Sequence, residues 1–304
     1  MKTAARIAET EPDRKAPRAA RSGVRGSLRL NFERDEPRGQ TVLAVAHQEP
    51  PLKVVRAFTI EGGAALVHLH NVSGGLLGGD ELAFTVSVGA GSRAQITTTG
   101  ATRVYRAHED AATTVVRNEI AVGENALLEY LPDPAIPYAG ARVCQRTMIR
   151  LAQGAGLFWW EILAPGREAR GEIFEYDSFE MKTDILALGR PILSERARLE
   201  PKKRDLSSAA RLATYRTWAS FYICRVGLTE RVWLDLESEI RQVAQQFVQP
   251  GETLWGISTL AAHGLVVRCV AKQGRHVSPG LHAIWDAAKQ RLYGSSAVPP
   301  RKVN

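Results

Sequence analysis

The feature that most constrains the fold of this chain is a succession of short stretches in which polar and apolar residues alternate. The first, SLRLNF at residues 27–32, has an apolar side chain at every second position, the pattern of a strand with one buried face. Similar stretches, mostly separated by Gly, Pro and Asp residues, follow at 41–48, 64–70, 82–88, 93–99, 113–122, 126–131, 143–151, 156–162 and 172–180. About ten strands without intervening helices predict a sandwich, a barrel or a β-solenoid.

Two helices are expected in the C-terminal third, near 235–248 and 279–293. The first presents a single apolar face made of Leu236, Ile240, Val243, Ala244 and Phe247. The second is expected to begin with Ser278 as N-cap and Pro279 in its first turn, and its apolar face consists of Leu281, Ile284, Trp285, Ala288 and Leu292. A strand over 264–270 separates the two helices.

Residues 1–22 are polar, rich in Arg, Ala and Glu, and without periodicity, which predicts a disordered basic tail. Residues 23–304 then form one β-rich domain. The chain lacks a run of about 20 apolar residues, as a membrane helix needs, and its first residues lack the apolar core of a secretory signal. From these features we expect the protein to be cytoplasmic and not to bind a membrane.

The chain of 304 residues carries a net charge of +8. A basic balance raises the question of nucleic-acid binding, but no helix-turn-helix, RNP or zinc-finger signature is present, so we expect no nucleic-acid partner. An acidic protein partner or a solubilising surface accounts for the charge equally well. Cys144, Cys224 and Cys269 are odd in number and far apart, which argues against a disulfide framework or a structural zinc site.

A glycine-rich stretch, NVSGGLLGGD at residues 71–80, lies between two expected strands. Its glycines are Gly74, Gly75, Gly78 and Gly79, and it ends on a carboxylate, Asp80. Glycine permits backbone conformations and close approaches that other residues resist. The stretch therefore predicts a sharp turn that aims Asp80 at a defined place.

Motifs of several enzyme classes are missing from the sequence. There is no G-x-S-x-G elbow, no P-loop, no dinucleotide-binding glycine fingerprint and no H-E-x-x-H. The glycine-rich stretch precedes an expected strand instead of a helix, so it is a poor phosphate cradle. The sequence thus argues against a nucleotide-using or hydrolytic enzyme.

His68 and His70 are two residues apart on an expected strand and project to the same face. Imidazole binds both Ni²⁺ and Zn²⁺, so the pair is a candidate metal site. The alternative is two half-exposed histidines with no metal.

Several motifs occur in a fixed order along the chain. After the glycine-rich stretch come TTTGATRVYR at 97–106, LEYLPDPAIPY at 128–138, GR at 166–167, RGEIF at 170–174 and LSER at 193–196. In this order and spacing the chain resembles the urease accessory protein family UreD, called UreH in some systems. The resemblance runs from about residue 23 to the C-terminal region.

This resemblance implies an irregular β-helical, solenoid-like stack with two α-helices. It also implies a non-enzymatic metallochaperone scaffold that binds the urease apoprotein, recruits UreF and, through UreF, the GTPase UreG. Nickel would pass transiently through the body, with no permanently bound cofactor. In the family, acidic residues at the positions of Asp80 and Glu195 are thought to line the nickel route.

Each of these residues has a structural alternative. Asp80 can accept hydrogen bonds that close the glycine turn, and Glu195 can form a salt bridge to Arg196 or Arg198. A route that passes Ni²⁺ must bind the ion and then release it. One or two carboxylates with water do this better than a closed cage of imidazole or thiolate ligands.

A second set of candidate residues follows the strand expected over 93–99. Arg103, Tyr105 and Arg106 form a basic and aromatic cluster for the interior or an interface, and Glu129 is a candidate counter-charge beside them. The run Phe158-Trp159-Trp160 indicates a strand that is buried on both faces. The alternative is that one of the two tryptophans is exposed for docking.

Two other functions compete with the scaffold. A β-solenoid enzyme acting on an acidic polysaccharide would use Asp80 and basic residues as its site. A nucleic-acid binder would rely on the net charge.

Overall fold

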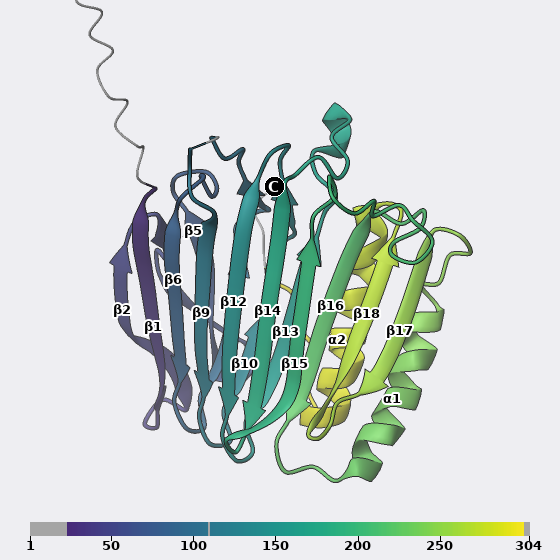
Figure 1. Cartoon of the computed structure of the whole chain (residues 1–304). Coiled ribbons are helices and arrows are strands. Elements are labelled where there is room, and N and C mark those ends of the chain that lie inside the picture. The colour runs from purple at the N-terminus through teal and green to yellow at the C-terminus, as the bar shows by residue number, and fades with distance from the viewer. Residues whose placement is uncertain (1–22, 109, 301–304) are drawn as a thin grey trace, which may run out of the picture.

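The structure is a computed structural model that describes residues 23–108 and 110–300. The tail expected over 1–22 lies outside the described residues. Two β-sheets and two α-helices form three layers (Figure 1): a first sheet, a second sheet behind it, and helices on the far side of the second sheet.

The first sheet has seven strands in the order β15-β14-β12-β9-β6-β1-β2. Their bounds, in chain order, are β1 Arg25–Asp35, β2 Gln40–Glu49, β6 Glu81–Val88, β9 Thr114–Val122, β12 Arg142–Leu151, β14 Ser178–Ala187 and β15 Arg190–Leu199. Pairs within this sheet are parallel except β1–β2 and β14–β15.

The second sheet has the main order β17-β18-β16-β13-β10-β7-β5-β3, with β4, β8 and β11 attached at its side. Its strands are β3 Leu52–Lys53, β4 Ala57–Ile60, β5 Ala64–Asn71, β7 Arg93–Thr98, β8 Thr102–Val104, β10 Leu127–Tyr130, β11 Ala135–Pro137, β13 Gly156–Leu163, β16 Thr217–Arg225, β17 Thr253–Thr259 and β18 Gly264–Ala271. The pairs β5–β7, β7–β10 and β10–β13 are parallel, and β13–β16, β16–β18 and β18–β17 are antiparallel.

The middle of the chain crosses repeatedly between the two sheets. β6, β9, β12 and β14 belong to the first sheet, and β7, β10 and β13 belong to the second. The expectation of a mostly β fold with two helices is confirmed. The expected solenoid is not shown, because both sheets mix parallel and antiparallel pairs.

The strand β13 shows how the period-two pattern builds two cores. Trp159 packs into the core between the two sheets, whereas Phe158 and Trp160 pack into the core between the second sheet and the helices. All three side chains are buried. The run of aromatic residues therefore reflects a strand covered on both faces.

The helices are α1, Glu230–Gln245, and α2, Val277–Tyr293. The apolar face expected on α2 is entirely buried, and α1 buries Trp233 one turn before the expected face. Ser278 lies inside α2 instead of capping it, because the helix begins at Val277. No helix in the described residues is long and apolar enough to cross a membrane.

Some strands differ from the expectation. The stretch 172–180 is a strand only from Ser178 onward, and Phe174 before it has a left-handed backbone with φ of 57°. β15, β16 and β17 were not anticipated. In β15 the polar/apolar alternation is broken by Glu195, a charged residue on the less exposed side, and β16 is largely apolar on both faces.

Candidate functional site: an interior cavity and its carboxylates

A cavity of about 370 Å³ lies between the two sheets. One end is bounded by the glycine turn and the loop after β7, including Gly74, Gly75, Thr98 and Arg103. The rest of its lining is largely apolar but includes the polar side chains of Asn118, Gln145 and Glu161. Loop residues at the mouth and the Glu161 carboxylate therefore line the same cavity.

Glu161 is one of two carboxylates that line this cavity, the other being Asp133, and the sequence reasoning did not identify it. It lies on β13 two residues after Trp159 and so faces the first sheet. Its oxygens accept hydrogen bonds from Gln145 Nε2, at 2.6 Å, and from Thr183 Oγ1, at 3.4 Å. Burial, and secondarily the negative charge of Glu195, raises the pKa of Glu161 to about 7.

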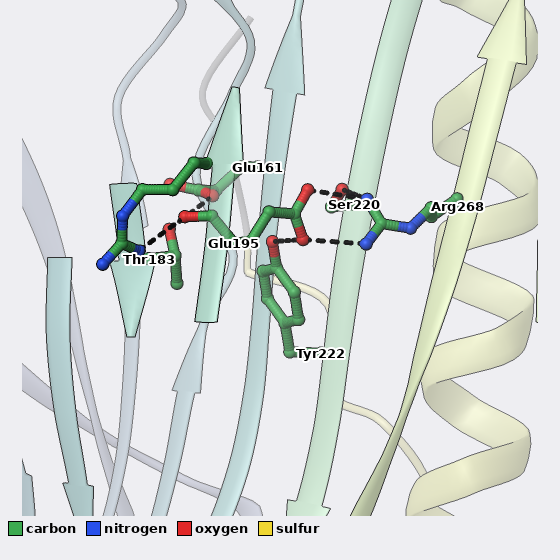
Figure 2. A network of polar contacts seen from close by, with 7 residues as sticks. Glu161, Thr183, Glu195, Ser220, Tyr222 and Arg268 are labelled. Carbon is green, nitrogen blue, oxygen red and sulfur yellow. Dashed lines mark hydrogen bonds and ion pairs between the residues drawn. The ribbon is translucent and has the colours of Figure 1, made fainter. Parts of the chain in front are cut away.

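Glu195 reaches from β15 across to the second sheet (Figure 2). Its Oε1 and Oε2 accept hydrogen bonds from Arg268 Nη1 and Nη2 at 2.6 and 2.9 Å. Tyr222 donates its hydroxyl to Oε2 at 2.9 Å. The ion pair is therefore made with Arg268 of β18, not with the side chains of Arg196 or Arg198.

The contacts with Glu195 affect the pKa values of its two donors, Arg268 and Tyr222. The hydrogen bond to Glu195 raises the pKa of the Arg268 guanidinium. Burial, reinforced by the charges of Glu161 and Glu195, raises the pKa of Tyr222 well above its ordinary value. Arg268 and Tyr222 therefore keep their protons and remain hydrogen-bond donors to Glu195.

Strand register joins these residues into one polar band. In the second sheet, Arg268, Ser220 and Glu161 are register partners on three adjacent strands. In the first sheet the corresponding row consists of Glu195, Thr183, Thr147 and Asn118. Register partners point to the same face of a sheet. The two rows face each other, and the band runs from the edge strand β15 to the cavity.

Asp80 is buried and does not line the cavity. Its Oδ1 accepts a hydrogen bond from the backbone N–H of Val24 at 2.9 Å, and its Oδ2 accepts one from Leu77 N–H at 2.8 Å. Asp80 therefore ties the glycine turn to the start of β1. This is the structural role considered above, in which Asp80 accepts hydrogen bonds that close the turn.

The glycines of the turn are explained by close packing on the segment around β8. A Cβ at Gly75 would lie 2.5 Å from the Tyr105 ring and 2.6 Å from the Arg103 carbonyl oxygen. Gly79 has a left-handed φ of 88°. Leu76 completes the contact by exchanging backbone hydrogen bonds with Arg103 and Tyr105. Gly74 and Gly75 reach the cavity, whereas Gly78 packs on Ala107.

The basic and aromatic cluster lies at the mouth of the cavity. Arg103 is exposed and lines the cavity. Tyr105 donates its hydroxyl to the Gly74 carbonyl at 3.3 Å and stacks edge-on against Tyr138. Arg106 is exposed beside Gly140.

Glu129 lies away from this cluster, on the helix side of the second sheet. It accepts hydrogen bonds from Trp285 Nε1 at 2.7 Å and from Lys289 Nζ at 3.0 Å, and both partners belong to α2. Burial raises the pKa of Glu129, although Lys289 opposes this shift. The expected counter-charge to Arg103 instead anchors a helix, because β10 places residue 129 on the opposite face from residues 128 and 130.

His68 and His70 lie on β5 and share a face, as alternation predicts. His68 stacks edge-on against Phe58, and His70 lines a separate shallow groove with Lys53 and Val55. Within residues 23–108 and 110–300, no group of three or more His, Cys, Asp or Glu side chains is placed to hold a metal ion. The three cysteines are free thiols.

Comparison with known proteins identifies the family of this chain. The family model described as UreD urease accessory protein matches residues 24–304. A urease accessory protein UreD of Herpetosiphon aurantiacus is 45% identical over 281 residues, which cover 92% of this chain and 96% of the relative.

More distant relatives agree. A urease accessory protein UreD of Pseudomonas aeruginosa is 33% identical over 83% of this chain and 85% of its own length. A urease accessory protein UreD 2 of Brucella abortus is 30% identical over 90% of each chain. The resemblance drawn from the ordered motifs is thereby confirmed, and the chain belongs to the UreD family of urease accessory proteins.

Proposed function

We propose that this chain is a non-catalytic scaffold of urease maturation in the cytoplasm. It binds the urease apoprotein, recruits UreF and, through UreF, the GTPase UreG, and conducts nickel toward the urease active site. The observation that carries this proposal is the family match over residues 24–304. The printed names of the relatives describe urease accessory proteins, and the alternative of a polysaccharide-acting enzyme has no comparable support.

The interior carboxylates support the nickel part of the proposal. Glu161 faces the cavity and accepts hydrogen bonds from two neutral side chains, Gln145 and Thr183. Glu195 adjoins it through Thr183, its register partner. A small number of oxygen ligands binds a hard divalent cation without trapping it. We therefore assign the transient nickel contacts to Glu161 and Glu195.

Asp80 has a supporting role in this proposal. Both of its oxygens already accept backbone N–H groups, and the turn that it fixes bounds the mouth of the cavity. His68 and His70 project from the face of β5 that is turned away from the first sheet, so they do not join the route.

The scaffold role is tested by co-expressing the full chain with the urease subunits and a UreF-type protein, followed by affinity capture of this chain. The proposal predicts a stoichiometric complex that also retains a UreG-type GTPase when UreF is present. A soluble, folded chain that captures neither urease nor UreF would contradict the scaffold role.

A further inference from the structure

An ion pair joins the two sheets at the side of the sandwich next to β15. The first sheet ends at β15, whereas the second sheet continues past it through β16, β18 and β17 (Figure 1). At this step Glu195 of β15 meets Arg268 of β18, as Figure 2 shows. The pair therefore lies where the space between the sheets reaches the protein surface.

The two partners of this pair differ in exposure. The Glu195 side chain is 14% exposed, and the Arg268 side chain is 45% exposed. An exposed guanidinium on a flexible stem can turn into water, while the carboxylate is held by the edge of the sandwich and by Tyr222. Opening of the pair is thus an outward movement of Arg268.

The space behind the pair is polar and leads to the cavity. Thr183, the register partner of Glu195, donates to Glu161, which lines the cavity. Farther inward, Asn118 Nδ2 donates to Thr147 Oγ1 at 3.0 Å, and Asn118 also lines the cavity. Hydroxyl, amide and carboxylate groups therefore line an unbroken band from Glu195 to the cavity.

Arg268 and a divalent cation compete for the same oxygens. The guanidinium engages both oxygens of Glu195, and Tyr222 takes a further lone pair, which leaves about one of four acceptor positions unused. The positive charge of Arg268 also repels a cation at this end of the band. Glu195 becomes a nickel ligand only when the guanidinium leaves.

We propose that Arg268 is a latch on the lateral end of the interior route, and that its release from Glu195 opens this end to nickel. The inference rests on the proposed function, because it concerns the same route. Arg268 acts here as a positioning residue through Glu195 and does not itself bind the metal.

The test is equilibrium dialysis of the purified full chain against Ni²⁺ alone. Arg268→Gln frees Glu195 and removes one positive charge, so we expect nickel to bind roughly tenfold more tightly than to the wild type. In Arg268→Gln combined with Glu195→Gln, this gain should disappear.

A matched control separates the latch from a general charge effect. Arg291→Gln removes the same charge from an ion pair with Glu239 on the helices, and it should leave nickel binding unchanged. Wild-type affinity in Arg268→Gln, or a gain that persists without Glu195, would overturn the latch.

Two milder variants keep the test valid if Arg268→Gln fails to fold. Arg268→Lys retains the charge but loses the two-point contact, and Tyr222→Phe removes one donor without a change in charge. Both should give smaller gains in nickel affinity that depend on Glu195, and no gain in either would count against the latch.

Failure of the latch is distinguishable from failure of the route. If Glu161→Gln and Glu195→Gln lower the nickel content of urease while Arg268→Gln leaves Ni²⁺ affinity unchanged, the latch is wrong and the route stands. If urease loads fully with both glutamate variants, the route itself is wrong, and the latch with it.

Discussion

Asp80 and Glu161 are both interior carboxylates, but their partners assign them different roles. Asp80 accepts two backbone N–H groups and so organises a turn. Glu161 accepts two neutral side-chain donors inside a cavity, where burial keeps its pKa near neutrality. The first carboxylate is a fixed part of the fold, and the second is available for exchangeable contacts.

At Asp80 the expected effect of substitution is on stability. Asp80→Ala removes the acceptor of two partly buried hydrogen bonds, from Val24 N–H and Leu77 N–H, and each hydrogen bond to a charged group contributes about 1.5–3 kcal/mol. We expect the free energy of unfolding to fall by about 2–4 kcal/mol in urea titrations. Glu33→Ala, at an exposed position on β1, is the control, and an equally small change in both variants would contradict the structural role.

At Glu161 the expected effect depends on pH. The folded chain holds this proton up to about pH 7, whereas the unfolded chain releases it near 4.5. The folded state therefore binds more protons in this window, so the contribution of Glu161 to stability is complete below the window and is lost as pH rises through it.

Glu161→Gln removes this pH dependence. Relative to the wild type, the variant should lose less stability between about pH 5 and about pH 8, by an amount on the order of 2 kcal/mol. Denaturant titrations at both pH values measure the difference. Parallel pH profiles for variant and wild type would show that Glu161 titrates normally.

Among the elements, α2 is fixed to the second sheet by a buried polar contact as well as by its apolar face. Lys289 and Trp285 both donate to Glu129 of β10. The side chains of Lys289 and Glu129 are 10% and 3% exposed. Burial makes this ion pair sensitive to loss of either partner.

Removing one partner should cost more than removing both. Lys289→Met leaves Glu129 buried and uncompensated, so we expect a loss of about 3–5 kcal/mol in the free energy of unfolding. Lys289→Met combined with Glu129→Gln should be less destabilised than Lys289→Met alone. Arg291→Met, which breaks the exposed pair with Glu239, should cost under about 1 kcal/mol. Additive single effects would argue against the buried pair.

The elements also show how far the sequence predicts the fold. Alternation located strands such as β1, β6 and β12, and the apolar face of α2 was correct residue by residue. Alternation does not report which strands pair, because β6 pairs with β9 although β7 and β8, which lie between them in the chain, belong to the other sheet. The mixed pairing of both sheets was therefore beyond the sequence pattern.

The site was predictable only in part for the same reason. Glu195 was singled out through the family resemblance, but its partner Arg268 is 73 residues away in the chain. Glu161 lies two residues after Trp159 on the same strand, so both side chains point to the same face. A charged residue on a face expected to be buried could have been recognised from the sequence. Long-range register, which no local pattern encodes, brings the three residues together.

The whole molecule places a polar interior band between two sheets and braces one of these sheets with helices. Within the described residues, this band links the edge at Glu195 to the cavity beside the glycine turn. As a member of the UreD family, the chain is expected to use this interior in a complex with its partners. We therefore propose that interior carboxylates, and not the outer surface, carry nickel.

The most direct test is the nickel content of urease matured in a reconstituted complex that contains wild-type chain, Glu161→Gln or Glu195→Gln. Glu81→Gln, which alters an exposed carboxylate at the start of β6, serves as the matched control. We expect equal recovery of all complexes, full nickel in urease with the wild type and Glu81→Gln, and severalfold less nickel with the two interior variants. Full nickel loading with both interior variants would contradict this proposal.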